Sequence, residues 1–154
     1  MADKSFSNEL QRALARPDLD DLVLNLEAYY EYMQAIAANK PDEWNHPGDP
    51  FDVQDAYQDP DRGLVYLALA AARYDDPHFL GVMAAGPLED VLRDPAPEML
   101  ERILSEARKT HRFRWMLAGV WLHAIAERAR EPAQEAVGGW SLDDTPLPER
   151  PWAS

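Results

Sequence analysis

The chain has 154 residues, with 15 Lys and Arg against 28 Asp and Glu, so its formal net charge is −13. Its 46% hydrophobic residues suffice for the core of one domain, which excludes a wholly disordered chain. No apolar run approaches the roughly 20 residues of a membrane span. No apolar segment of a secretory signal follows Met1–Lys4. The chain contains no cysteine, which excludes disulfides, thiolate zinc sites and cysteine nucleophiles and fits a cytoplasmic protein.

The negative charge is concentrated in the N-terminal half. Residues 1–63 hold 14 acidic and 5 basic side chains, whereas residues 111–130 hold 1 acidic and 4 basic ones. A chain of this charge repels phosphate backbones and anionic membrane surfaces, so we expect neither a nucleic-acid nor a membrane partner. The charge favours a basic protein partner, or serves solubility alone.

Helical periodicity of apolar residues dominates the chain, and no segment shows the alternation of a strand. The pattern therefore predicts an all-α fold, a single-domain bundle of about five or six helices. The segment 61–75 is apolar almost all round and is expected to be the buried central helix. The expected helical segments are 5–15, 18–39, 61–75, 78–85, 86–92, 97–109 and 111–130, the segment 86–92 with Pro87 at its first position.

Two segments interrupt this pattern. Residues 41–61 combine four prolines with seven Asp or Glu residues, which predicts a long acidic loop with one helical turn near 53–57. Residues 131–154 are rich in Pro and Gly, which predicts an irregular tail. We expect Trp140 and Trp152 to pack parts of this tail onto a helical domain formed by residues 1–130.

The acidic loop places Asp49, Asp52 and Asp55 at spacings of three residues. A calcium-binding EF-hand loop needs oxygen ligands at alternate positions, a central Gly and a distal Glu. The segment 41–61 does not have this arrangement. We therefore expect no metal site. The three carboxylates are either a solvated acidic surface or the contact face for a basic partner.

Basic residues cluster on the expected last helix, where Arg112 and Arg114 lie near its start. Arginine presents a fork of donors to phosphate or carboxylate groups, but these arginines can equally neutralise acidic helices of the same chain. His123 and Glu127 lie four residues apart on that helix, a spacing that suits either a general base with its partner or an ordinary surface contact. Glu89 either faces a helix N-terminus or reaches the arginines of the last helix.

The motifs of phosphate-binding loops, dinucleotide folds, zinc proteases and serine hydrolases are absent from the sequence. We therefore predict no catalytic residues and no cofactor.

The run Gly86-Pro87-Leu88-Glu89, followed by Phe113-Arg114-Trp115-Met116-Leu117 and Val120-Trp121, resembles a bacterial family of uncharacterised small helical proteins. The shared features are a G-P-L-E core and an F-R-x-x-L-x-x-V-W-like helix, and the similarity covers roughly residues 60–125. The resemblance implies an all-α fold, and it implies no particular activity. The loop 41–61 and the tail 131–154 lie outside it, so they are expected to carry any specificity of this chain.

Two functional hypotheses follow. The first is a non-enzymatic protein-binding module of the immunity, inhibitor or regulatory type, whose acidic half binds a basic partner. The second is a small enzyme or ligand-binding protein, with a pocket between residues 86–92 and the basic helix that uses Glu89, Arg112, Arg114 and His123. A homo-oligomer with exposed aromatic residues at its interface is a third possibility, and the sequence leaves the oligomeric state open.

Overall fold

The computed structural model describes residues 8–150. Its central element is helix α4 (Pro60–Arg73). Every residue of α4 from Gly63 to Ala72 is buried, as its apolar composition predicts. Helices from both sides pack against it, among them α1 (Asn8–Leu14) and α2 (Leu19–Ala37). A methyl group on Gly63 would lie 2.6 Å from Cβ of Ala56, so α4 and the segment before it are in direct contact.

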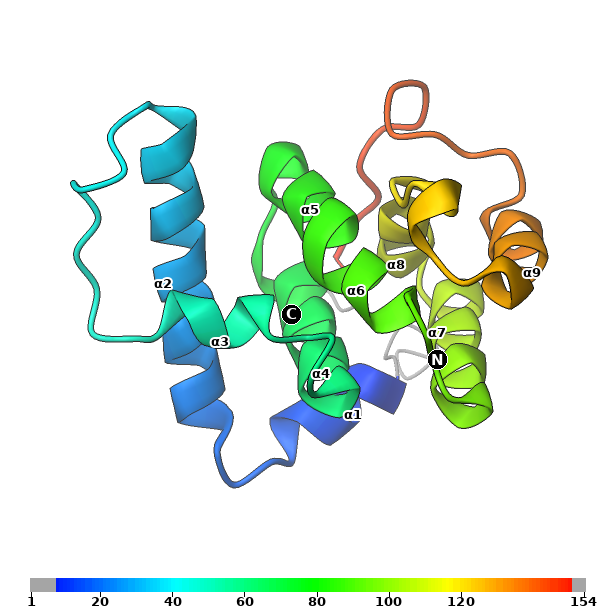
Figure 1. Ribbon diagram of the computed structural model, residues 1–154, viewed down its shortest axis with the longest axis horizontal. Coiled ribbons are helices and arrows are strands. Elements are labelled where there is room, and N and C mark those ends of the chain that lie inside the picture. The colour runs from blue at the N-terminus through cyan, green and yellow to red at the C-terminus, as the bar shows by residue number, and fades with distance from the viewer. Residues whose placement is uncertain (1–7, 151–154) are drawn as a thin grey trace.

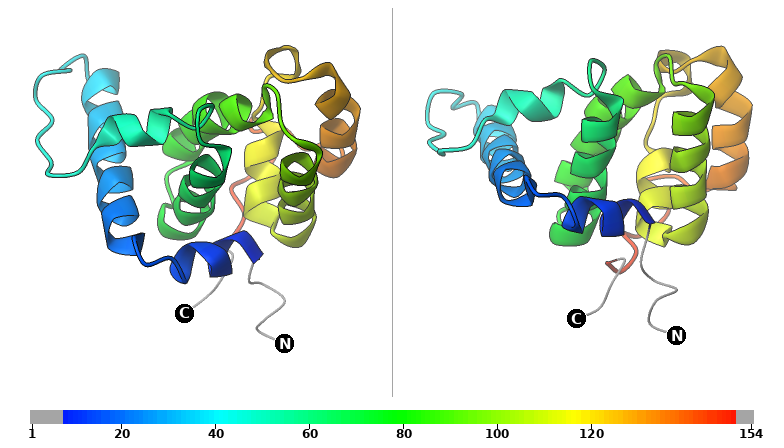
Figure 2. Two further views of the ribbon diagram at one scale, coloured as in Figure 1. Left: turned by 60° about the horizontal axis from the view of Figure 1, so that its bottom comes forward. Right: turned by 90° about the horizontal axis from the view of Figure 1, so that it is seen from below.

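The all-α fold is confirmed, since the described residues form helices and no strand. They form more helices than the expected five or six, because several are short. The remaining elements are α3 (Pro50–Gln54), α5 (Pro77–Met83), the π-helical turn η2 (Ala84–Leu88), α6 (Glu89–Leu92), α7 (Pro97–Lys109), α8 (His111–Ala118), the 3₁₀ turn η3 (Leu122–Ala124) and α9 (Glu127–Val137). Figures 1 and 2 show α2 and α3 at one end of the molecule and α8 and α9 at the other.

Three Asp-Pro pairs begin helices. Asp49, Asp59 and Asp76 each accept a hydrogen bond from a backbone N–H of the first turn, and the next proline occupies the first helical position. The prediction that residues 41–61 form a loop is therefore wrong in part. It contains α3 and the start of α4, because these prolines begin helices rather than interrupt them.

The helix predicted over 111–130 is also wrong, because the chain leaves the helix after Ala118. A side chain at Gly119 would lie 2.8 Å from a methyl of Leu142, and Trp121 is extended. The chain returns to a helix at Glu127, so the boundary expected at residue 130 falls inside α9. The tail becomes irregular only after α9 ends at Val137, where the C-cap residue Gly138 has a φ of +62°.

The helix start predicted at Pro87 is a third error. The chain stays helical from Pro77 to Leu92, and Pro87 lies inside the wider π-helical turn between α5 and α6. A proline donates no hydrogen bond, and a π turn is one way to relax the helix around it.

Arg112 connects α8 to the C-terminal end of α4 and to the tail. The residue is 3% exposed, and its guanidinium donates to the carbonyl oxygens of Ala71, Tyr74 and Pro148 at 2.7 to 3.1 Å. It also pairs with Asp75 at 3.0 Å. Arg150, from the tail, hydrogen-bonds the same carboxylate, and the two arginines lower the pKa of Asp75 to about 2. Pro148 and Arg150 of the tail therefore contact the helical domain here, and Trp152, which we expected to pack the tail, is outside the described residues.

Replacing Arg112 by Met is expected to lower the free energy of unfolding by about 3 kcal/mol or more, because three carbonyl groups lose a charged donor in a buried position. Urea denaturation of both proteins measures the difference. Arg128→Met is the matched control, since Arg128 is half exposed and pairs with the exposed Asp94. That change is expected to cost under about 1 kcal/mol. Equal losses of unfolding free energy in the two variants would contradict a structural role of Arg112.

Candidate functional site

Residues 18–61 form an acidic limb that consists of α2, the following loop, α3 and the first turn of α4. They contain twelve Asp or Glu residues and one basic residue, Lys40. α2 and α3 pack against each other at the edge of the molecule. A methyl group on Gly48 would lie 2.3 Å from the carbonyl oxygen of Leu24, so the loop before α3 runs directly against α2. Most of the net charge of the protein therefore lies on one limb.

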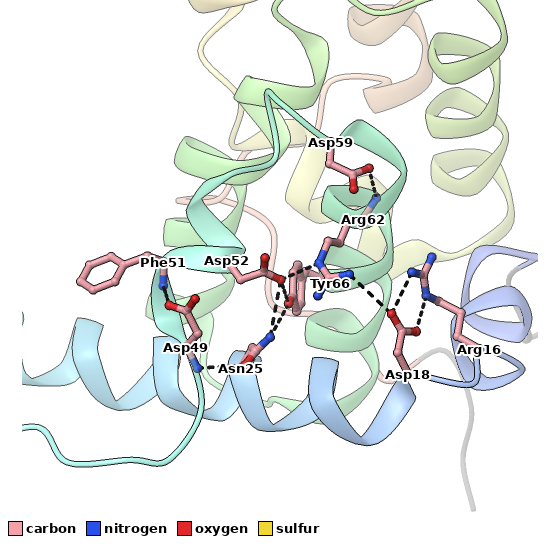
Figure 3. Close-up of polar contacts among 9 residues, drawn as sticks. All are labelled: Arg16, Asp18, Asn25, Asp49, Phe51, Asp52, Asp59, Arg62 and Tyr66. Carbon is pink, nitrogen blue, oxygen red and sulfur yellow. Dashed lines mark hydrogen bonds and ion pairs between the residues drawn. The ribbon is translucent and has the colours of Figure 1, made fainter.

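Asp52 holds α3 against α2 and α4 (Figure 3). Its carboxylate accepts hydrogen bonds from the Tyr66 hydroxyl and from Nε of Arg62, the latter at 2.6 Å. Nδ2 of Asn25 donates to the Tyr66 oxygen at 3.0 Å and lies 3.5 Å from Asp52. Burial, and then the bond to Asp52, raise the pKa of Tyr66 far above its usual range. The hydroxyl therefore stays a hydrogen-bond donor at neutral pH.

Asp18 extends this network to the turn between α1 and α2. Its carboxylate accepts two hydrogen bonds from Arg16, at 2.8 and 3.1 Å, and lies 3.4 Å from Nη1 of Arg62. The hydrogen bond from Arg16 lowers the pKa of Asp18. Arg62 thus links two carboxylates, and its own pKa is raised first by the bond to Asp52. Four segments of the fold meet through these side chains.

Phe51 projects from α3 with 53% of its surface exposed. Its backbone N–H donates to the Asp49 carboxylate at 3.0 Å, and the backbone N–H of Asp49 donates to Oδ1 of Asn25 at 2.8 Å (Figure 3). On its inner side the ring lies 5.5 Å from Tyr32, which in turn lies 5.6 Å from Trp44. The aromatic side chain is therefore exposed, with its ring against Tyr32 and its backbone fixed by the Asp49 cap.

The three aspartates predicted as a contact face have different surroundings. Asp49 is the N-cap of α3, and Asp52 is half buried in the polar network. Asp55 is exposed and has no side-chain partner among the described residues. Glu31 and Asp42 share these properties. The spacing of the aspartates in the sequence thus reflects helix capping and packing at two of the three positions.

The four residues predicted to line a pocket between residues 86–92 and the basic helix make separate contacts in the structure. Glu89 accepts a hydrogen bond from the backbone N–H of Trp121 at 2.9 Å, and so supports the chain where α8 has ended. Arg112 points to α4 and the tail. His123 is exposed in η3, which is a different element from the one that carries Glu127. The break at Gly119 separates these side chains.

Arg114 faces the turn after α9. Nε of Arg114 donates to the carbonyl oxygen of Val137 at 2.9 Å, and its guanidinium stacks 3.9 Å from the ring centre of Trp140. It borders a cavity of about 270 Å³ with Arg108, His111 and Glu135. A second cavity, of about 240 Å³, is lined by residues of α8, of α9 and by Trp140, and is mainly apolar. Neither cavity contains Glu89 or His123.

Sequence reasoning missed Asn25, Arg62 and Tyr66, although they hold the limb together. Arg62 and Tyr66 lie within the apolar run of α4, and Asn25 lies within the periodic apolar pattern of α2, so none of them stood out in the sequence. One signal was present, because a tyrosine inside a fully buried helix needs a hydrogen-bond partner. Within residues 8–150, no group of three or more His, Asp or Glu side chains could hold a metal, and no helix is long and apolar enough to cross a membrane.

Replacing Asp52 by Asn is expected to destabilise the protein by about 1–3 kcal/mol, because Arg62 loses its charged partner and Tyr66 its carboxylate acceptor. Asp55→Asn removes a carboxylate three residues away that bonds nothing, and its effect should stay within about 0.5 kcal/mol. Urea denaturation measures both. Hydrogen exchange at the backbone N–H of Phe51 should accelerate in the first variant alone. Equal behaviour of the two variants would contradict the role given to Asp52.

Comparison with known proteins places residues 33–137 in a described family, DUF6869, a family of unknown function. The match is wider than the region 60–125 and includes the segment 41–61, which the sequence resemblance had left outside. Asp52, Arg62 and Tyr66 therefore lie within the matched region, whereas Asn25 and Asp18 precede it. No curated protein and no solved structure matches the chain. Because the match covers more than half of its length, the chain belongs to the family of unknown function DUF6869.

Proposed function

We propose that the protein is a non-enzymatic binding module of the immunity, inhibitor or regulatory type, and that its acidic limb receives a basic protein partner. The observation that supports this proposal is Phe51, an exposed aromatic side chain held in place within a strongly acidic surface. Contact surfaces between proteins combine such aromatic anchors with a polar rim, and a few aromatic residues supply most of the binding energy.

The charges of the limb are of two kinds. Asp49 and Asp52 are engaged in holding α3, and their replacement would disturb the surface itself. Glu31, Asp42 and Asp55 are exposed and have no partner among the described residues. Their field extends into solvent, where it attracts a basic surface and accelerates association. Phe51 supplies the short-range contact that charge alone does not provide.

The geometry gives less support to the alternative, an enzyme or ligand-binding protein with a pocket at Glu89. Of the two cavities near Arg114, neither is lined by Glu89, Arg112 or His123. Glu89, Arg112 and Arg114 instead make bonds that hold the backbone of this chain. The acidic limb is therefore the better supported site.

The test is capture of a partner from the lysate of the native host by the tagged protein, at low and at high salt, with identification by mass spectrometry. We expect a basic protein that binds at low salt and is lost at high salt, since salt screens exposed charges. The affinity of the purified partner is then measured for variants. Charge reversal of Glu31, Asp42 and Asp55 to Lys should weaken binding about tenfold or more, mainly through slower association. Phe51→Ala should weaken it about tenfold through faster dissociation.

A matched control reverses Glu127, Glu131 and Glu135, which lie on α9 at the other end of the molecule. This variant carries the same change in net charge and should keep most of the affinity. Binding that depends only on total charge would weaken equally in both triple variants, and would remove the limb as the contact surface. A partner whose affinity is independent of ionic strength would also contradict the proposal.

A further inference from the structure

Arg114 is half buried and forms no ion pair within the described part of the chain. Its Nε donates to the carbonyl oxygen of Val137, and its guanidinium stacks on the ring of Trp140, so its orientation is fixed. The two terminal nitrogens, Nη1 and Nη2, have no acceptor among residues 8–150. In a chain with 28 carboxylates and only 15 Lys and Arg, most cations find a carboxylate. The outer donors of Arg114 are therefore open to a group from outside the chain.

Arg114 lines a polar cavity of about 270 Å³ together with residues of α7 and α9. These helices and α8 contact one another at the end of the molecule opposite α2 (Figures 1 and 2). Arg108, near the end of α7, and His111, at the start of α8, also line the cavity. Arg108 donates through Nη1 to the exposed Glu101 at 3.2 Å, and its other two nitrogens have no acceptor among the described residues. Three basic side chains thus line one cavity of a strongly acidic protein.

The sequence concentrates cations at this cavity. The segment 108–114 contains four Lys or Arg residues and one His, without any Asp or Glu. The sequence left two roles open for Arg112 and Arg114, an anionic ligand or the carboxylates of this chain. Arg112 takes the second role, since it points inward and pairs with Asp75. Arg114 has no such partner, which leaves the first role to it.

Glu135, on α9, is a carboxylate that lines the same cavity. It is exposed and forms no ion pair with Arg108, His111 or Arg114. The cavity therefore presents donors and an acceptor that do not satisfy one another. The donors suit an oxyanion, and the carboxylate suits an ammonium group. An apolar cavity of about 150 Å³ holds a benzene molecule, so this one has room for a small molecule that carries both groups.

We propose that this cavity binds a small oxyanion that carries an amino group, with the oxyanion on Arg108 and Arg114 and the amino group on Glu135. The Nη1–Nη2 edge of Arg114 offers two parallel N–H donors, which match two oxygens of a carboxylate or a phosphate. His111 adds a ring N–H donor. Amino acids and amino phosphates both have this chemistry. The site lies apart from the acidic limb and does not depend on a protein partner there.

The test is an NMR titration of the full chain with four probes at constant ionic strength. The probes are propionate and β-alanine, and ethyl phosphate and phosphoethanolamine. Within each pair, the second compound carries an ammonium group that the first lacks. We expect saturable shifts of the His111 backbone N–H and the Trp140 indole N–H, with a Kd of about 1 mM or below for at least one amino compound. That compound should bind about fivefold or more tightly than its amine-free partner, and comparison of the two pairs identifies the oxyanion.

Variants separate the two ends of the ligand. Arg114→Lys keeps the charge but loses the parallel donors, and Arg108→Gln loses a charge, so each should weaken every bound probe about fivefold or more. Glu135→Gln should remove only the preference for the amino compounds, an effect that a purely structural role would not produce. Arg93→Gln and Glu131→Gln are the matched controls. Arg93 is as exposed as Arg108 and also pairs with one carboxylate, and Glu131 lies on α9 one turn before Glu135. Urea denaturation establishes that each variant is folded.

Three results would overturn the proposal. One is the absence of saturable shifts with every probe up to about 20 mM. Another is equal weakening by Arg108→Gln and Arg93→Gln, which would indicate attraction to the overall charge rather than to this cavity. The last is equal affinity within each pair of probes, or a preference for the amino compounds that persists in folded Glu135→Gln protein.

Discussion

The burial of α4 on all sides is the constraint on which the rest of the structure depends. A helix with no solvent-facing stripe leaves no water for its polar groups, so the surrounding elements must supply hydrogen-bond partners. Arg112 supplies them at the C-terminal carbonyl groups, and Asp59 at the first turn. Tyr66 is the one polar side chain in the buried run from Gly63 to Ala72. Its hydroxyl determines where Asp52 must lie, and through Asp52 it determines the position of α3.

This chain of dependence connects the core to the surface. Because α3 has only five residues, its own backbone hydrogen bonds cannot hold it in place. The Asp49 cap and the bonds of Asp52 to Arg62 and Tyr66 hold it instead. Phe51 lies between these two aspartates, so the core controls the orientation of an exposed aromatic ring. Several carboxylates of the acidic limb are therefore part of the structure, and the rest are available to a partner.

The sequence was sufficient to predict a helix where a single periodic pattern of apolar residues determined it. The apolar run of α4 predicted a buried helix, and the period of α2 predicted its long helix to within two residues at each end. The errors arose where a contact distant in the sequence decides the local conformation. A side chain at Gly119 would press on a methyl of Leu142, and Glu89 accepts the hydrogen bond that stabilises the chain at Trp121. Neither contact has a local signature. The Asp-Pro pairs did have one, since an N-cap followed by proline is a start signal for a helix.

The break after α8 also explains why the residues of the candidate ligand site lie in different elements. In a continuous helix, Trp121 and His123 would have lain on the body of the domain beside the arginines. Arg112 points inward to α4 and Arg114 stacks on Trp140, whereas Trp121, after the break, is exposed. The same interruption thus divides one expected basic helix into α8 and α9, whose arginines bond backbone carbonyl groups of this chain. The exposed charges of the acidic limb are available to a partner.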